Sequence, residues 1–109
     1  MNVLFICSRN KLRSPTAAQV FDGRAGIATD SAGLAPDAEC QLELDQLAWA
    51  DIVFVMEKSH RTKLTRLYSA YLRSKKLICL DIPDNYTFMQ PELIELFERK
   101  VPRHLGLGI

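Results

Sequence analysis

Residues 2–22 read Asn-Val-Leu-Phe-Ile-Cys-Ser-Arg-Asn-Lys-Leu-Arg-Ser-Pro-Thr-Ala-Ala-Gln-Val-Phe-Asp, and this stretch predicts a strand, a tight loop and a helix. The apolar run from Val3 to Ile6 is typical of a strand covered on both faces of a parallel sheet. Ser14 suits a helix N-cap, and Pro15 suits the first helical position, where no N–H donor is needed. The residues between strand and helix carry a thiol, an amide and three cations, which makes this loop a candidate anion site.

The loop has the chemistry needed to bind a phosphoryl group. A helix N-terminus offers unpaired N–H groups and the positive end of the macrodipole, and a loop that curls back on it adds further amides. We expect Arg13 to hold two phosphoryl oxygens with its planar guanidinium, and Cys7 to lie below the phosphorus. The same positive field favours the thiolate of Cys7 at neutral pH. Such a thiolate, anion site and guanidinium suffice for nucleophilic phosphoryl transfer.

The spacing Cys7-x5-Arg13-Ser14 resembles the C-x5-R-[ST] signature of cysteine-dependent phosphatases. Its position directly after the first strand, followed by Pro15, is similar to the low-molecular-weight protein tyrosine phosphatases. Further similarities to that family are Asn10 in the loop, Ser31-Ala32-Gly33 after the second strand, the strand Asp51-Ile52-Val53-Phe54-Val55-Met56, and Asp81-Ile82-Pro83-Asp84-Asn85-Tyr86, which resembles the acid loop. The resemblance extends from Asn2 to about Val101.

The resemblance implies a three-layer α/β/α domain with a four-stranded parallel sheet. It also implies phosphomonoester hydrolysis of the protein tyrosine phosphatase type, through a phosphocysteine on Cys7 and without metal or other cofactor. Arg13 would stabilise the transferred group, and Asp84 would be the general acid, with Asp81 as the second choice. Tyr86 would form an aromatic wall for the substrate. The implied phosphate-binding residues are Cys7, Ser8, Arg9, Asn10, Lys11, Leu12, Arg13 and Ser14.

Three positions depart from the family pattern. Arg9 stands where glycine is usual, Leu12 stands where a second cysteine is usual, and Asn85 stands where proline follows the acid. The connections around residues 34–48 and 70–76 are also shorter than in the usual family member. These departures concern the choice of substrate more than the binding of phosphate.

Two alternatives to a phosphatase remain open at this point. The Arg9 and Asn85 departures are the reason for the first alternative, a phosphate-binding or phosphopeptide-binding module that has lost turnover. The other alternative is an arsenate reductase, in which Cys40 and Cys79 would relay a disulfide after Cys7 has bound arsenate. The expected partner is a phosphorylated protein or a small phosphoester substrate.

The 109 residues, of which 48% are hydrophobic and 25% charged, predict a single domain, 1–109. A net charge of +1 gives no overall field for nucleic acid or for a membrane surface. The sequence has no apolar run that could span a bilayer and no signal peptide, so we expect a cytoplasmic protein. The three cysteines fit neither a zinc pattern nor a disulfide framework, and reduced thiols are expected.

The rest of the chain alternates between strand and helix, which predicts a parallel sheet with helices on both faces. Further strands are expected at residues 27–32, 51–56 and 77–80. Further helices are expected at 42–48, after a cap at Ser59, and at 91–100, with a loose tail from His104 onward. His60 and His104 have no evident partner in the sequence and are expected at the surface.

Overall fold

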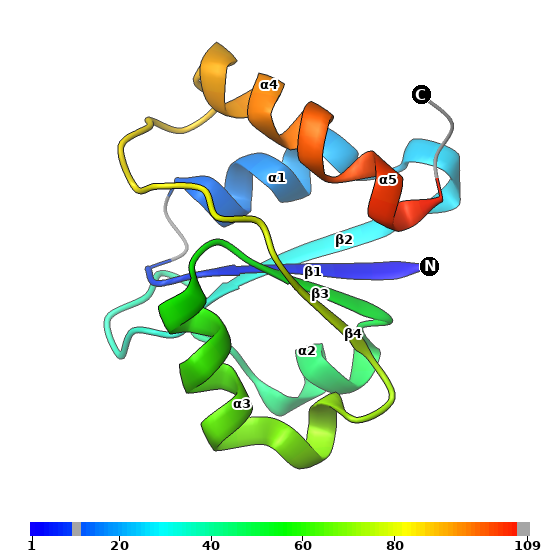
Figure 1. Cartoon of the computed structure of the whole chain (residues 1–109), viewed down its shortest axis with the longest axis vertical. Coiled ribbons are helices and arrows are strands. Elements are labelled where there is room, and N and C mark those ends of the chain that lie inside the picture. The colour runs from blue at the N-terminus through cyan, green and yellow to red at the C-terminus, as the bar shows by residue number, and fades with distance from the viewer. Residues whose placement is uncertain (10–11, 107–109) are drawn as a thin grey trace.

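A four-stranded parallel sheet forms the middle layer of the computed structural model, which describes residues 1–9 and 12–106 (Figure 1). All neighbouring strands are parallel, so the predicted four-stranded parallel sheet is confirmed. In spatial order the strands are β2 (Ala28–Gly33), β1 (Asn2–Cys7), β3 (Ile52–Val55) and β4 (Lys76–Cys79).

Helices cover both faces of the sheet, as the alternating pattern predicted. Figure 1 shows α1, α4 and α5 on one face and α2 and α3 on the other. This gives the three-layer α/β/α arrangement. The helices are α1 (Arg13–Phe21), α2 (Leu44–Trp49), α3 (Lys58–Leu72), α4 (Pro91–Lys100) and α5 (Pro102–Leu105), with a short 3-10 turn η1 (Arg24–Gly26) before β2.

Strand β1 divides its side chains between two apolar clusters, because successive strand residues point to opposite faces. Val3, Phe5 and Cys7 belong to the cluster that includes Phe21, Leu93 and Phe97 of α1 and α4. Leu4 and Ile6 belong to the cluster that includes Leu47 of α2 and Leu64 of α3. Burial of each large apolar side chain contributes about 1.5–3 kcal/mol, so β1 is fixed from both sides.

The starts of two helices differ from the prediction. Helix α1 begins at Arg13 with Leu12 as its N-cap, so Ser14 as cap is wrong. The Ser14 hydroxyl instead lies 2.9 Å from the Cys7 sulfur. Helix α3 begins at Lys58, and its N-cap is Glu57 instead of Ser59, because Glu57 and the side chain of His60 form a capping box.

The C-terminal segment is also more ordered than predicted. Pro102 does not simply end α4, because it begins the short helix α5, in which Leu105 is 6% exposed and joins the core. The expected loose tail is therefore wrong for His104 and Leu105, and residues 107–109 lie outside the described part. Within residues 1–9 and 12–106, no helix has the length and apolarity needed to cross a membrane.

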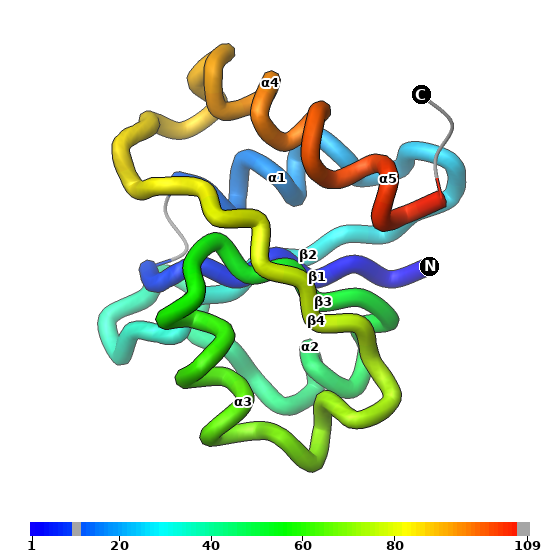
Figure 2. The backbone as a smooth tube through the Cα atoms, viewed as in Figure 1, coloured from blue at the N-terminus to red at the C-terminus, as the bar shows by residue number. Residues whose placement is uncertain are grey.

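The strand order places a crevice at the carboxyl ends of β1 and β3. From β1 the chain passes through α1 to β2 on one side, whereas from β3 it passes through α3 to β4 on the other. Loops that diverge in this way leave a crevice between them, where ligands of open α/β sheets bind. In Figure 2 the end of β1 and the segment after β4 both lie at the end of the molecule away from the N-terminus. The candidate phosphate loop is therefore at the topological switch point.

Candidate active site

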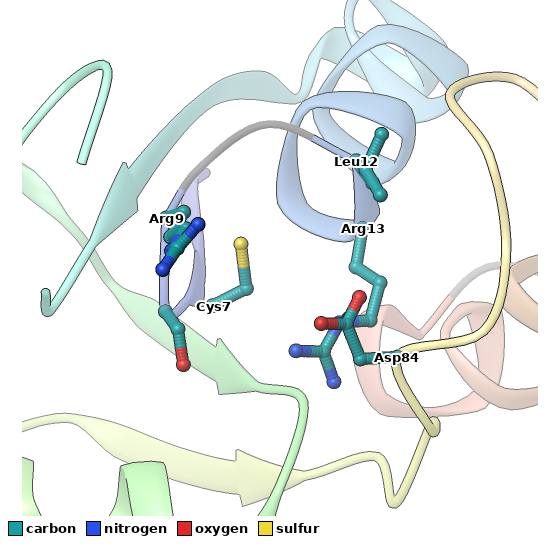
Figure 3. A pocket seen from close by; sticks show the side chains of 6 residues that line it. Cys7, Arg9, Leu12, Arg13 and Asp84 are labelled. Atoms are coloured by element: carbon teal, nitrogen blue, oxygen red, sulfur yellow. The ribbon is translucent and has the colours of Figure 1, made fainter. Parts of the chain in front are cut away.

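A cavity of about 420 Å³ opens at this crevice. The residues described as lining it come from the loop after β1, the start of α1 and the segment after β4. Figure 3 shows the Cys7 thiol between Arg9 on one side and Arg13 on the other, with the Asp84 carboxylate beside the Arg13 guanidinium. The lining residues are Cys7, Ser8, Arg9, Leu12, Arg13 and Asp84.

Cys7 is fixed at the last position of β1, and its side chain is only 3% exposed. Its sulfur lies 2.9 Å from the Ser14 hydroxyl, which is fully buried and lies 3.5 Å from the Ala32 carbonyl oxygen. A thiolate has no proton to give, so toward a thiolate the Ser14 hydroxyl acts as donor. Such a hydrogen bond to an ionised group is stronger than one between neutral groups, and it stabilises the charged sulfur.

Arg13 is held in one orientation although it is charged and only 3% exposed. Its Nη1 donates to Glu57 Oε2 at 2.7 Å and to the Ile82 carbonyl oxygen at 2.8 Å. Its Nε lies 3.6 Å from Asp84 Oδ1. A buried guanidinium is costly unless it is paired and hydrogen-bonded, and these contacts meet that need. The guanidinium is therefore pre-positioned before any anion arrives.

Glu57 was missed by the sequence reasoning. It follows β3 directly and caps α3, so it lies at the same rim as Cys7. A signal was present, because an acid placed after an interior parallel strand comes to the edge where ligands bind. The sequence reasoning followed this rule for Asp84 but did not apply it to β3.

The backbone of the candidate phosphate loop is hydrogen-bonded to the segment after β2. The carbonyl oxygens of Cys7, Ser8 and Arg9 accept hydrogen bonds from the N–H groups of Leu34, Ala35 and Glu39 at 3.0, 2.7 and 3.0 Å. In a trans peptide the N–H points opposite to the carbonyl, so the N–H groups of Ser8 and Arg9 point away from this segment. Successive amides directed to one side form the concavity that binds anions.

Asp84 and Asp81 have different surroundings. Asp84 lines the Cys7 cavity, and its side chain is 61% exposed. Asp81 instead lines a neighbouring hollow with Glu57 and Lys58, and its carboxylate accepts a hydrogen bond from the Cys79 thiol at 3.4 Å. Of the two acids considered from the sequence, the structure brings Asp84 to the cysteine.

Several predicted site residues are placed less directly. Tyr86 is half-buried against the apolar cluster around Phe5 and is not among the described residues that line the cavity. Arg9 is exposed, and its Nε lies 3.6 Å from Asp37. Asn10 and Lys11 lie outside the described residues.

His60 is buried, so its predicted surface position is wrong. The residue is 5% exposed. Its Nε2 lies 2.9 Å from Ser8 Oγ and 3.7 Å from Glu57 Oε2, and its Nδ1 accepts from the Glu57 N–H at 3.2 Å. Burial lowers the pKa of His60, and the nearby Arg13 charge lowers this pKa further, whereas the carboxylates of Glu57 and Asp84 oppose the shift. A helical face pattern places a first-turn residue relative to its own helix only, and it gives no information about the loop that packs over it.

The remaining thiols lie outside the cavity lining. Cys40 is exposed and Cys79 is half-buried, and neither forms a disulfide. Burial raises the pKa of Cys79. Neither thiol is among the described residues that line the Cys7 cavity, so the cavity lining does not bring together the three cysteines that the relay of an arsenate reductase needs. Among residues 1–9 and 12–106, no group of three His, Cys, Asp or Glu side chains is arranged to hold a metal ion.

No protein-family model and no curated protein sequence matches the chain. Solved structures do match over nearly its whole length. The YwlE arginine phosphatase from Geobacillus stearothermophilus is 20% identical over 96% of this chain and 93% of its own, with a TM-score of 0.75. The low-molecular-weight protein tyrosine phosphatase SP-PTP from Streptococcus pyogenes is 17% identical over 96% and 91%, with a TM-score of 0.76.

The tyrosine phosphatase Wzb from Escherichia coli K30, solved in complex with phosphate, is 21% identical over 98% of both chains, with a TM-score of 0.70. These likenesses show that the chain has the low-molecular-weight phosphatase fold. The fold implied by the sequence resemblance is therefore confirmed.

Proposed function

We propose that this protein is a cysteine-dependent phosphatase that hydrolyses phosphomonoesters through a phosphocysteine on Cys7. The observation that carries the proposal is the convergence of three groups on one cavity. These are the Cys7 thiol, the pre-positioned Arg13 guanidinium and the Asp84 carboxyl. The tyrosine and arginine phosphatases that share the fold support a phosphorylated protein or a small phosphoester as substrate.

In the first step the Cys7 thiolate attacks phosphorus and the bond from phosphorus to the ester oxygen breaks. Asp84 gives its proton to the departing oxygen, so the alcohol leaves neutral. Arg13 and the loop N–H groups stabilise the charge on the three equatorial oxygens. This step requires no metal, because the guanidinium and the amides supply the positive field.

In the second step the Asp84 carboxylate takes a proton from water, and the water oxygen attacks the phosphocysteine. The sulfur–phosphorus bond breaks, inorganic phosphate forms, and the Cys7 thiolate is restored. The Ser14 hydroxyl, 2.9 Å from the sulfur, stabilises the departing thiolate. The same carboxyl group thus serves as acid in the first step and as base in the second. It can do so because the leaving oxygen and the attacking water occupy the same side of the phosphorus, opposite the sulfur.

Hydrolysis of p-nitrophenyl phosphate by the reduced protein tests the proposal. We expect turnover in the wild type that phosphate and arsenate inhibit, and loss of turnover with retained phosphate binding in Cys7→Ser. Cys40→Ser is the matched control and should keep full activity, because Cys40 is exposed and is not among the residues described as lining the cavity. Full activity in Cys7→Ser would refute the mechanism. Thermal stabilisation by phosphate without any turnover would instead support a binding module.

A further inference from the structure

One imidazole connects the two halves of the candidate phosphate site. His60 lies in the first turn of α3, under the crevice, and contacts both Ser8 of the loop and Glu57, which holds Arg13. We propose that His60 is a positioning residue, whose neutral imidazole fixes the phosphate loop and the Arg13 guanidinium relative to each other. The proposal rests on the proposed function for its kinetic readout, and its binding readout needs only the phosphate site.

The hydrogen bonds determine which ring nitrogen carries the proton. The Glu57 N–H can only donate, so His60 Nδ1, 3.2 Å away, must be an unprotonated acceptor. In a neutral imidazole the proton is then on Nε2, which donates to Ser8 Oγ at 2.9 Å. The ring thus has a defined tautomer. Its Nε2 also lies 3.7 Å from Glu57 Oε2, the oxygen that accepts from Arg13 Nη1, so Nε2 faces both Ser8 and this carboxylate.

The second contact reaches the guanidinium through one residue. The backbone N–H of Glu57 donates to His60 Nδ1, and the Glu57 Oε2 accepts from Arg13 Nη1 at 2.7 Å. Because Glu57 is the residue at which α3 begins, fixing its backbone also fixes the direction of its carboxylate. Ser8 in turn follows Cys7 directly, so a shift of Ser8 moves the thiol. His60 therefore controls the separation of the nucleophile and the guanidinium.

Charged groups from several elements face the ring. Arg13 from α1 and Lys63 from α3 disfavour a second proton on His60, whereas Glu57 and Asp84 favour it. Burial is the largest influence and keeps the pKa of His60 below its ordinary value of 6.5. A second proton would place an N–H on Nδ1 against the Glu57 N–H, and the bond between them would be lost. The bridge therefore exists only while the ring is neutral.

A double-mutant cycle on phosphate binding tests this inference. In His60→Asn the amide oxygen takes the place of Nδ1 and keeps the Glu57 contact, but the side chain is too short to reach Ser8. We expect Ser8→Ala and His60→Asn each to weaken inorganic phosphate binding about three- to tenfold, the size of one hydrogen bond. The double variant should bind no more weakly than either single variant, because both remove the same bond.

Two further variants complete the test. His60→Gln places its amide N–H near the position of Nε2 and keeps the bond to Ser8, but it leaves the Glu57 N–H without its acceptor, so it should weaken phosphate binding about three- to tenfold as well. His104→Asn changes the other histidine, which lies in α5 and packs near the Phe54 ring, and should leave phosphate affinity unchanged. Additive losses in the double variant, or wild-type phosphate affinity in either His60→Asn or His60→Gln, would overturn the inference.

The pH dependence supplies a readout that a packing role would not change. As the pH falls through the pKa of His60, the wild type should lose the Glu57 contact that His60→Asn keeps, whereas its Nε2–H can still donate to Ser8. The ratio of the phosphate dissociation constants of His60→Asn and wild type should therefore fall. The titration of phosphate itself is common to both proteins and cancels in this ratio. A ratio that does not change with pH would contradict the bridge.

Hydrolysis of p-nitrophenyl phosphate by the same variants separates this inference from the proposed function. If kcat/KM of the His60 and Ser8 variants changes in parallel with their phosphate affinity, the proposed function and this inference are both supported. If the wild type binds phosphate with the predicted pattern but does not hydrolyse the ester, the proposed function fails and the inference stands. If Cys7-dependent turnover is present but the cycle is additive, the inference fails alone. Absence of phosphate binding would overturn both.

Discussion

At the scale of single residues, the site combines one rigid and one adjustable charged group. Arg13 is buried and held by Glu57 and the Ile82 carbonyl, so it is aligned before phosphate binds. Asp84 is mostly exposed and makes a longer contact to Arg13, at 3.6 Å. An exposed carboxyl has room to approach a leaving oxygen and later a water, which a buried one would not. The role of proton donor therefore suits Asp84 better than Glu57.

Replacement of this carboxyl should slow the enzyme according to the leaving group. We expect Asp84→Asn to lower kcat for phenyl phosphate by about 10²-fold or more, the usual contribution of a general acid. The loss in the first step should be smaller for p-nitrophenyl phosphate, because nitrophenolate leaves without a proton. The kcat/KM values of the two esters measure the difference, because kcat/KM includes only the steps up to release of the alcohol, whereas slow hydrolysis of the shared phosphocysteine affects kcat for both.

Asp81→Asn is the matched control for this prediction. Asp81 contacts the Cys79 thiol and lines the neighbouring hollow, so its loss should change kcat for both esters by less than about threefold. A larger loss in Asp81→Asn than in Asp84→Asn would reverse the assignment of the acid.

Sequence patterns placed Cys7 at the end of a strand and Arg13 at the start of a helix, and the resemblance of residues 81–86 to the acid loop placed Asp84 at the same rim. They could not locate His60, whose partner Ser8 is 52 positions away in the chain. Glu57 is similarly 44 positions from Arg13. Contacts of this kind depend on how α3 packs over the loop, and no local pattern encodes that packing.

At the scale of elements, the candidate phosphate loop depends on a segment that contributes no side chain to the described lining of the cavity. The carbonyl oxygens of residues 7–9 accept hydrogen bonds from N–H groups within residues 34–39. The N–H groups of Ser8 and Arg9 therefore point away from that segment. The approach is close enough to require glycine at the end of β2. A Cβ on Gly33 would lie 2.6 Å from the Ser8 carbonyl oxygen and 2.6 Å from the Ala38 Cβ.

Gly33→Ala should therefore disturb both stability and catalysis. We expect the free energy of unfolding to fall by about 1–3 kcal/mol, as overpacking does, because the backbone around Ser8 must shift. The same shift should raise KM for an aryl phosphate. Urea unfolding and steady-state kinetics measure the two effects.

Gly26→Ala provides the comparison. Gly26 has φ +77 and open space where a Cβ would lie, so the change costs roughly 1 kcal/mol of backbone strain without a clash. It should lower stability but leave KM unchanged, since η1 lies outside the phosphate loop. Unaltered kinetics in Gly33→Ala would show that the loop does not depend on this approach.

Strands and most helices could be predicted from the apolar runs and the 3.6-residue periodicity, and the observed bounds differ by a few residues. The helix starts were less predictable. Ser14 and Ser59 have the chemistry of caps, but Ser14 is engaged by Cys7 and the start of α3 is capped by Glu57 with His60. At Ser14 a contact with the preceding strand thus overrode the local preference, whereas at α3 one local cap took the place of another.

At the scale of the whole molecule, two apolar clusters, one on each face, hold the sheet whose carboxyl edge carries the site. The alternation of strands and helices predicted the parallel sheet, but the spatial order β2-β1-β3-β4 is set by packing between distant segments. This order puts β1 beside β3, and so puts the loop after Cys7 beside Glu57.

The buried histidine should make global stability depend on pH. His60 has a pKa below 6.5 in the native protein, so the unfolded chain binds more protons in the interval between that pKa and 6.5. The stabilising contribution of the neutral ring is complete above about pH 6.5 and is lost as the pH falls through this interval. Between pH 7.5 and pH 5, the free energy of unfolding should therefore fall more in the wild type than in His60→Asn.

Urea unfolding of both proteins at the two pH values measures this difference. His104, whose pKa is also lowered by burial, is present in both proteins, so its contribution cancels in the comparison. An identical pH dependence of unfolding in the two proteins would show that His60 does not titrate as its burial requires.

The measurement that tests the central claim most directly is the isolation of the covalent intermediate. Asp84→Asn should form the phosphocysteine from p-nitrophenyl phosphate and hydrolyse it slowly, because the second step lacks its base. A denaturant quench, trypsin digestion and mass spectrometry then locate the phosphoryl group. Trypsin cuts after Arg9, so residues 1–9 form one peptide that contains Cys7 and neither Cys40 nor Cys79. We predict close to one phosphoryl group per protein on Cys7. Turnover with no phosphorylated peptide, or a phosphoryl group on any other residue, would contradict the account.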